Sequence, residues 1–416
     1  MTLDSVVARR AIESLRNGVP SGAAVRALGW PHAAQLNKFD VLLENARNDA
    51  AEPRGAVVVG EFGTGKSHLL GYLEQRALEE NFVVSRVVVS KETPLFKPER
   101  VLAAALREGR VPGARGSIIH ELAPRVNFGA AESDGLAKWA TSAPGMLAAS
   151  LHLYERSVEL ADDELLSRVV DWWAGEKLLP AEIKAGLRKL RAQNAFDVRA
   201  IKPAELVHHR IALVANLVKA VGFSGWLILL DEVELVGRYG RLQRANSYAE
   251  LARWFGRSAN ATPSTACIAT VTDDFTAKVL DGGKDGLDDR QRVPDFLRTR
   301  NKPGDLELAS LAEEGIDALD DPSAIYLQGP DESILKATKV RVAEVYEAAF
   351  QWSPPFALPS LMSTTTPMRT YIKTWIYAWD LARLGITERP TIESEILMQS
   401  YEQDGALETT AEEDAV

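Results

Sequence analysis

One octapeptide constrains the fold of this chain more than any other feature. It runs Gly60-Glu61-Phe62-Gly63-Thr64-Gly65-Lys66-Ser67 and matches the phosphate-loop pattern G-x-x-x-x-G-K-[ST] at every fixed position. A short apolar segment, AVVV, precedes it, and a stretch with helical spacing of apolar residues follows it. This strand, loop and helix order is the context that the pattern requires. The sequence therefore predicts the first unit of an α/β fold with a phosphate-binding loop.

The residue types in this loop suit phosphate chemistry. The glycines let the backbone wrap so that its N–H groups point at phosphates, and the helix that begins near Lys66 adds the positive end of its dipole. Lys66 is expected to reach the β- and γ-phosphates, and Ser67 offers a hydroxyl to Mg²⁺, a hard cation that prefers oxygen. We therefore expect ATP and Mg²⁺ as ligands. The expected ATP contacts are Gly60, Glu61, Phe62, Gly63, Thr64, Gly65, Lys66, Ser67 and His68, the last as a helix-face side chain rather than a base.

A second apolar strand ends in two carboxylates. The segment Trp226 to Leu230 is followed by Asp231 and Glu232. At the carboxyl end of a parallel strand, Asp231 would lie beside the glycine loop and hold Mg²⁺ through its water. Glu232 would orient and deprotonate the attacking water. Glu234, two residues further on, is interpreted as a helix-start charge.

A third strand, Ala266 to Thr272, ends in Thr-Asp-Asp. We expect Thr272 to touch the γ-phosphate or the lytic water, with Asp273 as the alternative. A helix N-cap formed by Asp273 or Asp274 explains the same residues equally well. Arginines that could stabilise transferred charge include Arg369, and four others could act across a subunit boundary: Arg253, Arg257, Arg298 and Arg300.

The chain divides into several predicted parts. Residues 1–50 are predicted as an N-terminal helical segment, and 51–285 as the α/β core, with a helical insertion at about 98–206. The apolar run Phe82 to Val89 is expected to pair beside the first strand. Strands are expected to stop beyond Asp281, so that 286–386 forms a mainly helical C-terminal lid domain, and 387–416 is an acidic tail.

Composition excludes several function classes. No run approaches the roughly 18 apolar residues of a membrane span, and the first residues lack the apolar region of a secretory signal, so we expect a cytoplasmic location. The single cysteine, Cys267, lies in an apolar run and cannot form an internal disulfide. Much of the net charge of −10 is concentrated in the tail, which leaves DNA open as a partner of the body. Two basic stretches, around Lys184–Arg191 and Arg290–Lys302, are explained adequately as solvated faces.

Several peptides resemble one known family. ARRAIESLRNGVPSGAAVRALG, GEFGTGKSHLL, NFVVSRVVVSKETPL, LLDEVELV and MRTYIKTWIYAWDL are similar to the ATP-binding proteins of BREX-type phage-defence islands, BrxD-like, which share a broader likeness to AAA+ ATPases of the Orc/Cdc6 kind. The resemblance implies an ATPase that works with other defence proteins, with DNA nearby. It places the nucleotide site on Gly60–Ser67 and Asp231–Glu232. It also places Arg9 and Arg10 near the base and gives Arg369 the role of a sensor arginine.

The leading hypothesis is therefore a Mg²⁺-dependent, ATP-hydrolysing AAA+-like subunit with a regulatory or motor role. Two alternatives remain open. One is a nucleotide-gated scaffold with little turnover, and the other is a DNA-stimulated loader or translocase. The sequence leaves the oligomeric state open, with a homo-oligomer among the possibilities.

Overall fold

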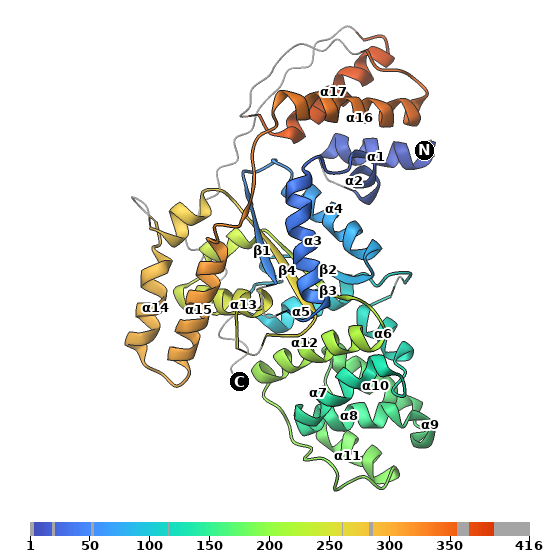
Figure 1. Cartoon of the computed structure of the whole chain (residues 1–416), viewed down its shortest axis with the longest axis vertical. Coiled ribbons are helices and arrows are strands. Elements are labelled where there is room, and N and C mark those ends of the chain that lie inside the picture. Colours follow the sequence, from blue (N-terminus) through green and yellow to red (C-terminus); the bar gives the residue numbers. More distant parts are fainter. Residues whose placement is uncertain are drawn as a thin grey trace.

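Five parallel strands form the centre of the molecule (Figure 1). The computed structural model describes residues 4–18, 21–50, 54–114, 116–259, 261–282, 286–355 and 366–386, and the predicted acidic tail lies outside them. The strands are β1 (Gly55–Gly60), β2 (Phe82–Val88), β3 (Gly225–Asp231), β4 (Thr265–Val271) and β5 (Ile325–Leu327), and they lie in the order β2-β3-β4-β1-β5. All pairings are parallel, so the predicted α/β class is confirmed.

Two expectations about the strands are wrong. β2 pairs with β3 rather than with β1, and β4 lies between β3 and β1. β3 and β4 are buried along their whole length, which suits the centre of a parallel sheet, whereas β2 carries a half-buried arginine and an exposed last residue and lies at the edge. Strands also do not stop at Asp281, because β5 pairs with the other side of β1. With only three residues, β5 is too short to produce a sequence pattern.

Helices cover both faces of the sheet. On one face, α3 (Ala33–Arg47) and α4 (Lys66–Glu79) share a core with inward residues of β1 to β5. The other face is covered by α12 (Pro203–Ala220) and α13 (Arg241–Trp254). α14 (Asp289–Arg300) and α15 (Asp305–Leu319) pack beside α13, where a buried Arg244–Asp289 ion pair joins α13 to α14. The short helices η3 (Val233–Arg238) and η4 (Thr276–Leu280) follow β3 and β4.

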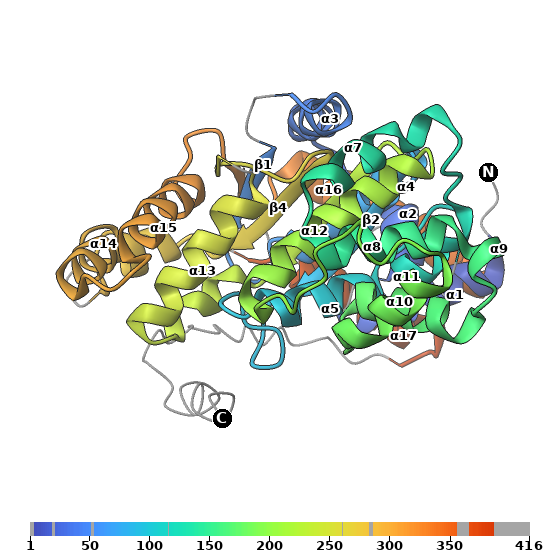
Figure 2. The same ribbon diagram turned by 90° about the horizontal axis from the view of Figure 1, so that it is seen from below.

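The segment between β2 and α12 is helical, as predicted. It contains α5 (Pro98–Glu108), α6 (Ile118–Leu122), η1 (Ala123–Arg125), η2 (Ala131–Ser133), α7 (Asp134–Ser142), α8 (Gly145–Glu155), α9 (Ser157–Leu160), α10 (Asp163–Ala174) and α11 (Pro180–Lys189). α7 to α11 gather at the end of the molecule drawn at the bottom of Figure 1, which faces the viewer in Figure 2. Trp173 is fully buried there and donates its indole N–H to Ser150, 2.9 Å away.

Helices from the two ends of the described chain share a third core. α1 (Ser5–Asn17) and α2 (Gly22–Leu28) pack against α16 (Glu332–Phe350) and α17 (Met368–Arg383) (Figure 1). Arg16 joins α1 to α17 through Asp380, at 2.8 Å. Apolar residues at helical spacing on each helix supply this core, which is separate from the two cores on the sheet. None of the helices in the described ranges combines the length and apolar character that a membrane span requires.

Candidate functional site

The glycine loop connects the end of β1 to the first turn of α4. Gly63 and Gly65 have φ values of +84° and +109°, a backbone region that other residues rarely adopt, so these glycines make the tight wrap. The Lys66 ammonium donates to the carbonyl oxygens of Gly60 and Glu61, at 2.5 and 3.3 Å. Burial lowers the pKa of Lys66, although four nearby carboxylates, Glu234 foremost, act against that shift. Within the described part of the chain, the hydrogen-bond partners of this lysine are thus backbone oxygens of the loop itself.

Asp231 lies beside the loop serine, as the sequence predicted. Its Oδ2 accepts hydrogen bonds from the Ser67 hydroxyl at 3.1 Å and from the Arg86 guanidinium at 2.6 Å. Its Oδ1 accepts from the Thr270 hydroxyl at 2.7 Å. The carboxylate is buried and fixed by three donors from three different elements. Ser67 and Asp231 therefore present two oxygens at one point, a donor set that suits a hard cation.

Glu232 has an unusual backbone conformation. Its φ of +61° and ψ of +37° place it in the left-handed region, which is costly for a residue with a side chain and is often found at functional sites. The Glu232 amide donates to the Thr270 hydroxyl at 3.1 Å, and this bond fixes the turn. Partial burial, together with the Asp231 charge, raises the pKa of the Glu232 carboxyl. Glu232 lines the cavity described below, where its side chain can meet a water molecule.

Glu234 lies in the first turn of η3, as interpreted from the sequence, but it does more than carry a helix-start charge. Its side chain is buried and lines the same cavity as Lys66. One carboxyl oxygen, Oε2, is buried with no hydrogen-bond partner among the described residues. Burial raises the pKa of Glu234 to about 7, against the attraction of Lys66. A third acid in a D-E-x-E run was the available sequence signal, but periodicity alone does not say which way its side chain points.

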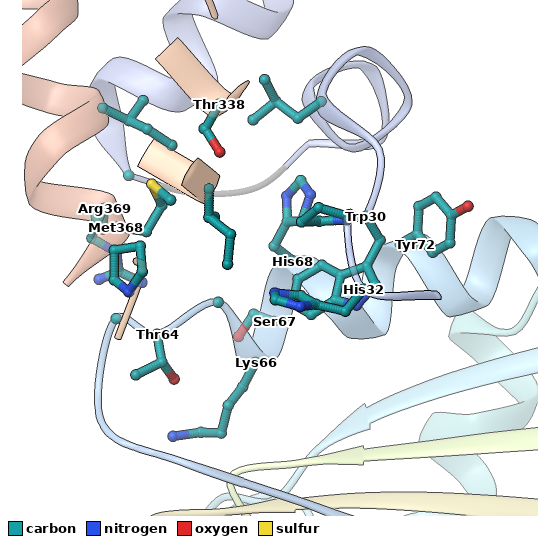
Figure 3. A pocket seen from close by; sticks show the side chains of 18 of the residues that line it. Trp30, His32, Thr64, Lys66, Ser67, His68, Tyr72, Thr338, Met368 and Arg369 are labelled. Atoms are coloured by element: carbon teal, nitrogen blue, oxygen red, sulfur yellow. The ribbon is translucent and has the colours of Figure 1, made fainter. Parts of the chain in front are cut away.

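A cavity of about 520 Å³ opens above the loop, and its lining brings these residues together. Figure 3 shows the part of it that contains Thr64, Lys66 and Ser67. Its floor is the glycine loop with Asp231, Glu232 and Glu234. Its walls come from the α2–α3 connection and from α16 and α17, which belong to the third core. The α16 and α17 wall thus belongs to a different hydrophobic core from α4, whereas Trp30 packs against the same core as α4.

Aromatic rings line one wall of this cavity: Trp30, His32, His68 and Tyr72 (Figure 3). The Trp30 ring centroid is 5.5 Å from that of His32 and 6.1 Å from that of His68. His68 lies on α4 as predicted, and its Nε2 is 3.0 Å from the Gly29 carbonyl oxygen, which can only accept. Burial lowers the pKa of His68, consistent with a neutral ring that ties the α2–α3 connection to α4. The sequence analysis did not predict Trp30 as part of the site, although this tryptophan stands out in the segment Gly29-Trp30-Pro31-His32.

Arg369 reaches this cavity from the start of α17. Its guanidinium carbon lies 4.9 Å from the centroid of the Phe62 ring in the glycine loop. Arg341 of α16 also lines the cavity and was not predicted. Arg9 and Arg10 are absent from the lining among the described residues, and Arg9 instead donates to the Ala349 carbonyl at 2.8 Å, joining α1 to α16.

The other candidate arginines are engaged within the chain. Their partners are Glu250 for Arg253, Asp321 for Arg257, Glu313 for Arg298 and Asp305 for Arg300. In the second predicted basic stretch, Arg290 also meets three carboxylates, those of Asp281, Asp317 and Asp320. These pairs neutralise much of the charge that a phosphate backbone would need.

Thr272 lies immediately after β4 and is buried. It is not among the described residues that line the cavity. Thr270, two residues earlier and on the same strand, is the threonine that contacts Asp231 and Glu232. A hydroxyl inside an otherwise apolar strand was a usable signal, because a buried polar group needs a partner.

Comparison with known proteins gives one match. A family model described as "BREX system ATP-binding protein BrxC/D" matches residues 5–112 and 134–349, which is more than half of the chain. The matched ranges include the glycine loop, β2, β3, β4 and α16. No curated protein and no solved structure matches the chain.

Proposed function

The chain belongs to the BREX system ATP-binding protein BrxC/D family, and from this premise we propose that it binds ATP with Mg²⁺ in the cavity above Gly60–Ser67 and hydrolyses it. One observation carries the proposal. The loop residues Lys66 and Ser67 share a single cavity with Asp231 and Glu232, although about 165 residues separate the two motifs along the chain.

The phosphate side of the site supplies positive groups. The loop N–H groups and the N-terminus of α4 face the position that the phosphates would take, and Lys66 would exchange its backbone carbonyl partners for β- and γ-phosphate oxygens. Ser67 and Asp231 would hold Mg²⁺, which when bound neutralises charge on those oxygens. Arg369 is proposed to add positive charge from the opposite wall.

The hydrolytic step is assigned to Glu232. Its carboxylate accepts a proton from a water molecule as the water oxygen bonds to the γ-phosphorus. The bond to the β,γ-bridging oxygen breaks, and ADP and phosphate leave. Thr270 keeps the Glu232 backbone in its left-handed conformation, which aims the side chain into the cavity. For Thr272 we propose a supporting role at the end of β4, and no direct part in the hydrolytic step.

The proposed partners are inferred from the family match rather than from the geometry of the cavity. Other proteins of the same phage-defence system, in the cytoplasm, are the proposed partners of this ATPase.

A nucleotide-gated scaffold is the second candidate function. It is favoured by the fact that the α16 and α17 wall belongs to the third core, whereas α4 and the Trp30 wall belong to a core on the sheet, so a bound nucleotide would join the two.

Removing the loop lysine tests ATP binding. Lys66→Ala is expected to weaken ATP about 10- to 100-fold, because charge-assisted hydrogen bonds to phosphate are lost. Equilibrium binding of a fluorescent ATP analogue measures the change, and turnover is followed in parallel with and without DNA. Lys336→Ala, which removes an exposed lysine paired with Glu332, is the matched control. Unchanged affinity in Lys66→Ala would contradict the site, whereas binding without turnover under every condition would favour the scaffold.

Shortening Trp30 tests the aromatic wall. Trp30→Ala is expected to weaken ATP and ADP by about 5- to 150-fold if the base stacks on this ring, because such stacking is worth roughly 1–3 kcal/mol. Trp30→Phe should retain most of the affinity. Inorganic tripolyphosphate, which has no base, should bind wild type and Trp30→Ala equally, as measured by calorimetry. An equal loss for tripolyphosphate would instead assign Trp30 to the shape of the loop.

A further inference from the structure

Arg86 is a cation aimed at the proposed metal site from outside the cavity. It lies on β2, the neighbour of β3, and its Nη2 is 2.6 Å from Asp231 Oδ2. Oδ2 is the same oxygen that accepts the Ser67 hydroxyl. Arg86 is not among the described residues that line the cavity, so it approaches the carboxylate from the β2 side. The oxygen that would face Mg²⁺ is therefore already neutralised by a side chain.

The surroundings make this contact more than a surface ion pair. The Asp231 side chain is 5% exposed and the Arg86 side chain 26%. A buried carboxylate without a countercharge is strongly unfavourable, so Asp231 needs a cation whenever no metal is bound. Arg86 also leaves its own Nε buried without a hydrogen-bond partner among the described residues. In this position Arg86 donates a hydrogen bond to Asp231, while its own Nε stays without a partner among the described residues.

We propose that Arg86 is the resident counter-ion of Asp231 in the metal-free protein and that a divalent cation at Ser67 and Asp231 competes with it for Oδ2. This inference rests on the proposed function, because it takes Ser67 and Asp231 as the Mg²⁺ ligands. Arg86 acts through Asp231 and is a positioning residue. It keeps the carboxylate paired and oriented between rounds of nucleotide binding, and its positive charge weakens the binding of Mg²⁺.

Two readouts that do not require turnover test this role. The first is the thermal stability of the full chain without nucleotide, in EDTA and across a Mg²⁺ titration at constant ionic strength. The second is the Mg²⁺ concentration at which half of a fluorescent ADP analogue is bound. Arg86→Gln is expected to lower the melting temperature in EDTA and to recover stability as Mg²⁺ rises. It should also lower the Mg²⁺ midpoint about tenfold or more, because the metal no longer competes with a close charge partner for Oδ2.

Matched variants separate this role from ordinary structural support. Arg76→Gln removes a similar arginine whose partner, Asp40, lies away from the cavity, and it should lower stability equally in EDTA and in Mg²⁺. Adding Asp231→Asn to Arg86→Gln should abolish the response to Mg²⁺. If Arg86→Gln behaves like Arg76→Gln, with the wild-type Mg²⁺ midpoint, the proposal is overturned.

A folding failure would not end the test. Arg86→Lys keeps a positive charge that supports folding, but its shorter side chain does not place that charge as close to Oδ2 as arginine does. A lowered Mg²⁺ midpoint in that variant supports the proposal, and a wild-type midpoint overturns it. Failure of the proposed function would look different. In that case, the wild type and Lys66→Ala would bind and hydrolyse ATP to the same extent. The Mg²⁺ dependence of thermal stability would still distinguish Arg86→Gln from the wild type.

Discussion

Replacing Glu232 with glutamine is expected to reduce ATP turnover about 10²- to 10⁴-fold, the range that a positioned general base contributes. Glutamine keeps the size of the side chain and cannot accept the proton of the attacking water. The main chain should not change, because the left-handed turn is fixed by the bond between the Glu232 amide and Thr270 rather than by the carboxylate. ATP binding should therefore persist in the variant, since Lys66, Ser67 and Asp231 are untouched.

Single-turnover hydrolysis and equilibrium binding measured on the same preparation check this result. Glu79→Gln, at the exposed end of α4, is the matched control and should hydrolyse ATP like the wild type. Turnover at the wild-type rate in Glu232→Gln would remove Glu232 from the chemical step and direct attention to Glu234. Loss of ATP binding together with turnover would mean that the substitution disturbs the loop.

The second large effect concerns stability and pH. Burial raises the pKa of Glu234 from 4.5 to about 7, so the folded protein holds this proton more tightly than the unfolded chain does. The stability that this group contributes is fully present below about pH 4.5 and is lost as pH rises through about 7. Ionising Glu234 in the folded protein at pH 8 thus costs about 3 kcal/mol, from the difference of the two pKa values. Glu234→Gln carries no such cost.

Denaturant unfolding at several pH values measures this effect. From pH 5 to 8, the free energy of unfolding of the wild type should fall relative to Glu234→Gln by about 2–3 kcal/mol. Comparing the two curves matters, because Glu232 also has a raised pKa and remains in both proteins. Glu79→Gln should give a curve parallel to that of the wild type. Parallel curves for the wild type and Glu234→Gln would show that the buried carboxyl finds a partner or water in solution.

Local patterns predicted the features that depend on neighbouring residues in the chain. The glycine loop was found because strand, turn and helix follow each other without interruption, and the turn at Gly63 and Gly65 requires glycine. The strand ending in Asp231 and Glu232 was found because apolar residues run unbroken to two carboxylates. The meeting of Ser67 with Asp231 was also predictable, since carboxyl ends of parallel strands lie along one edge of a sheet.

The remaining parts of the site depend on contacts between distant segments. Strand order was mispredicted because nothing in β2 specifies whether β1 or β3 will be its neighbour, and β5 was missed because three residues carry no period. Thr270 was not predicted because the sequence does not give the register between β3 and β4. Trp30 and Arg369 reach one cavity only because α1 and α2 pack on α16 and α17.

By itself, the sequence determined the glycine loop between strand and helix, the two carboxylates at the end of β3 and the parallel α/β class, because each follows from short-range geometry and the burial of apolar runs. Only the tertiary structure decided that Glu234 turns inward beside Lys66, that Arg86 neutralises Asp231, and that helices from both ends of the described chain close over the loop. The physical reason is that these contacts join groups far apart in sequence, whose charges and burial are set by how the cores assemble rather than by their neighbours in the chain.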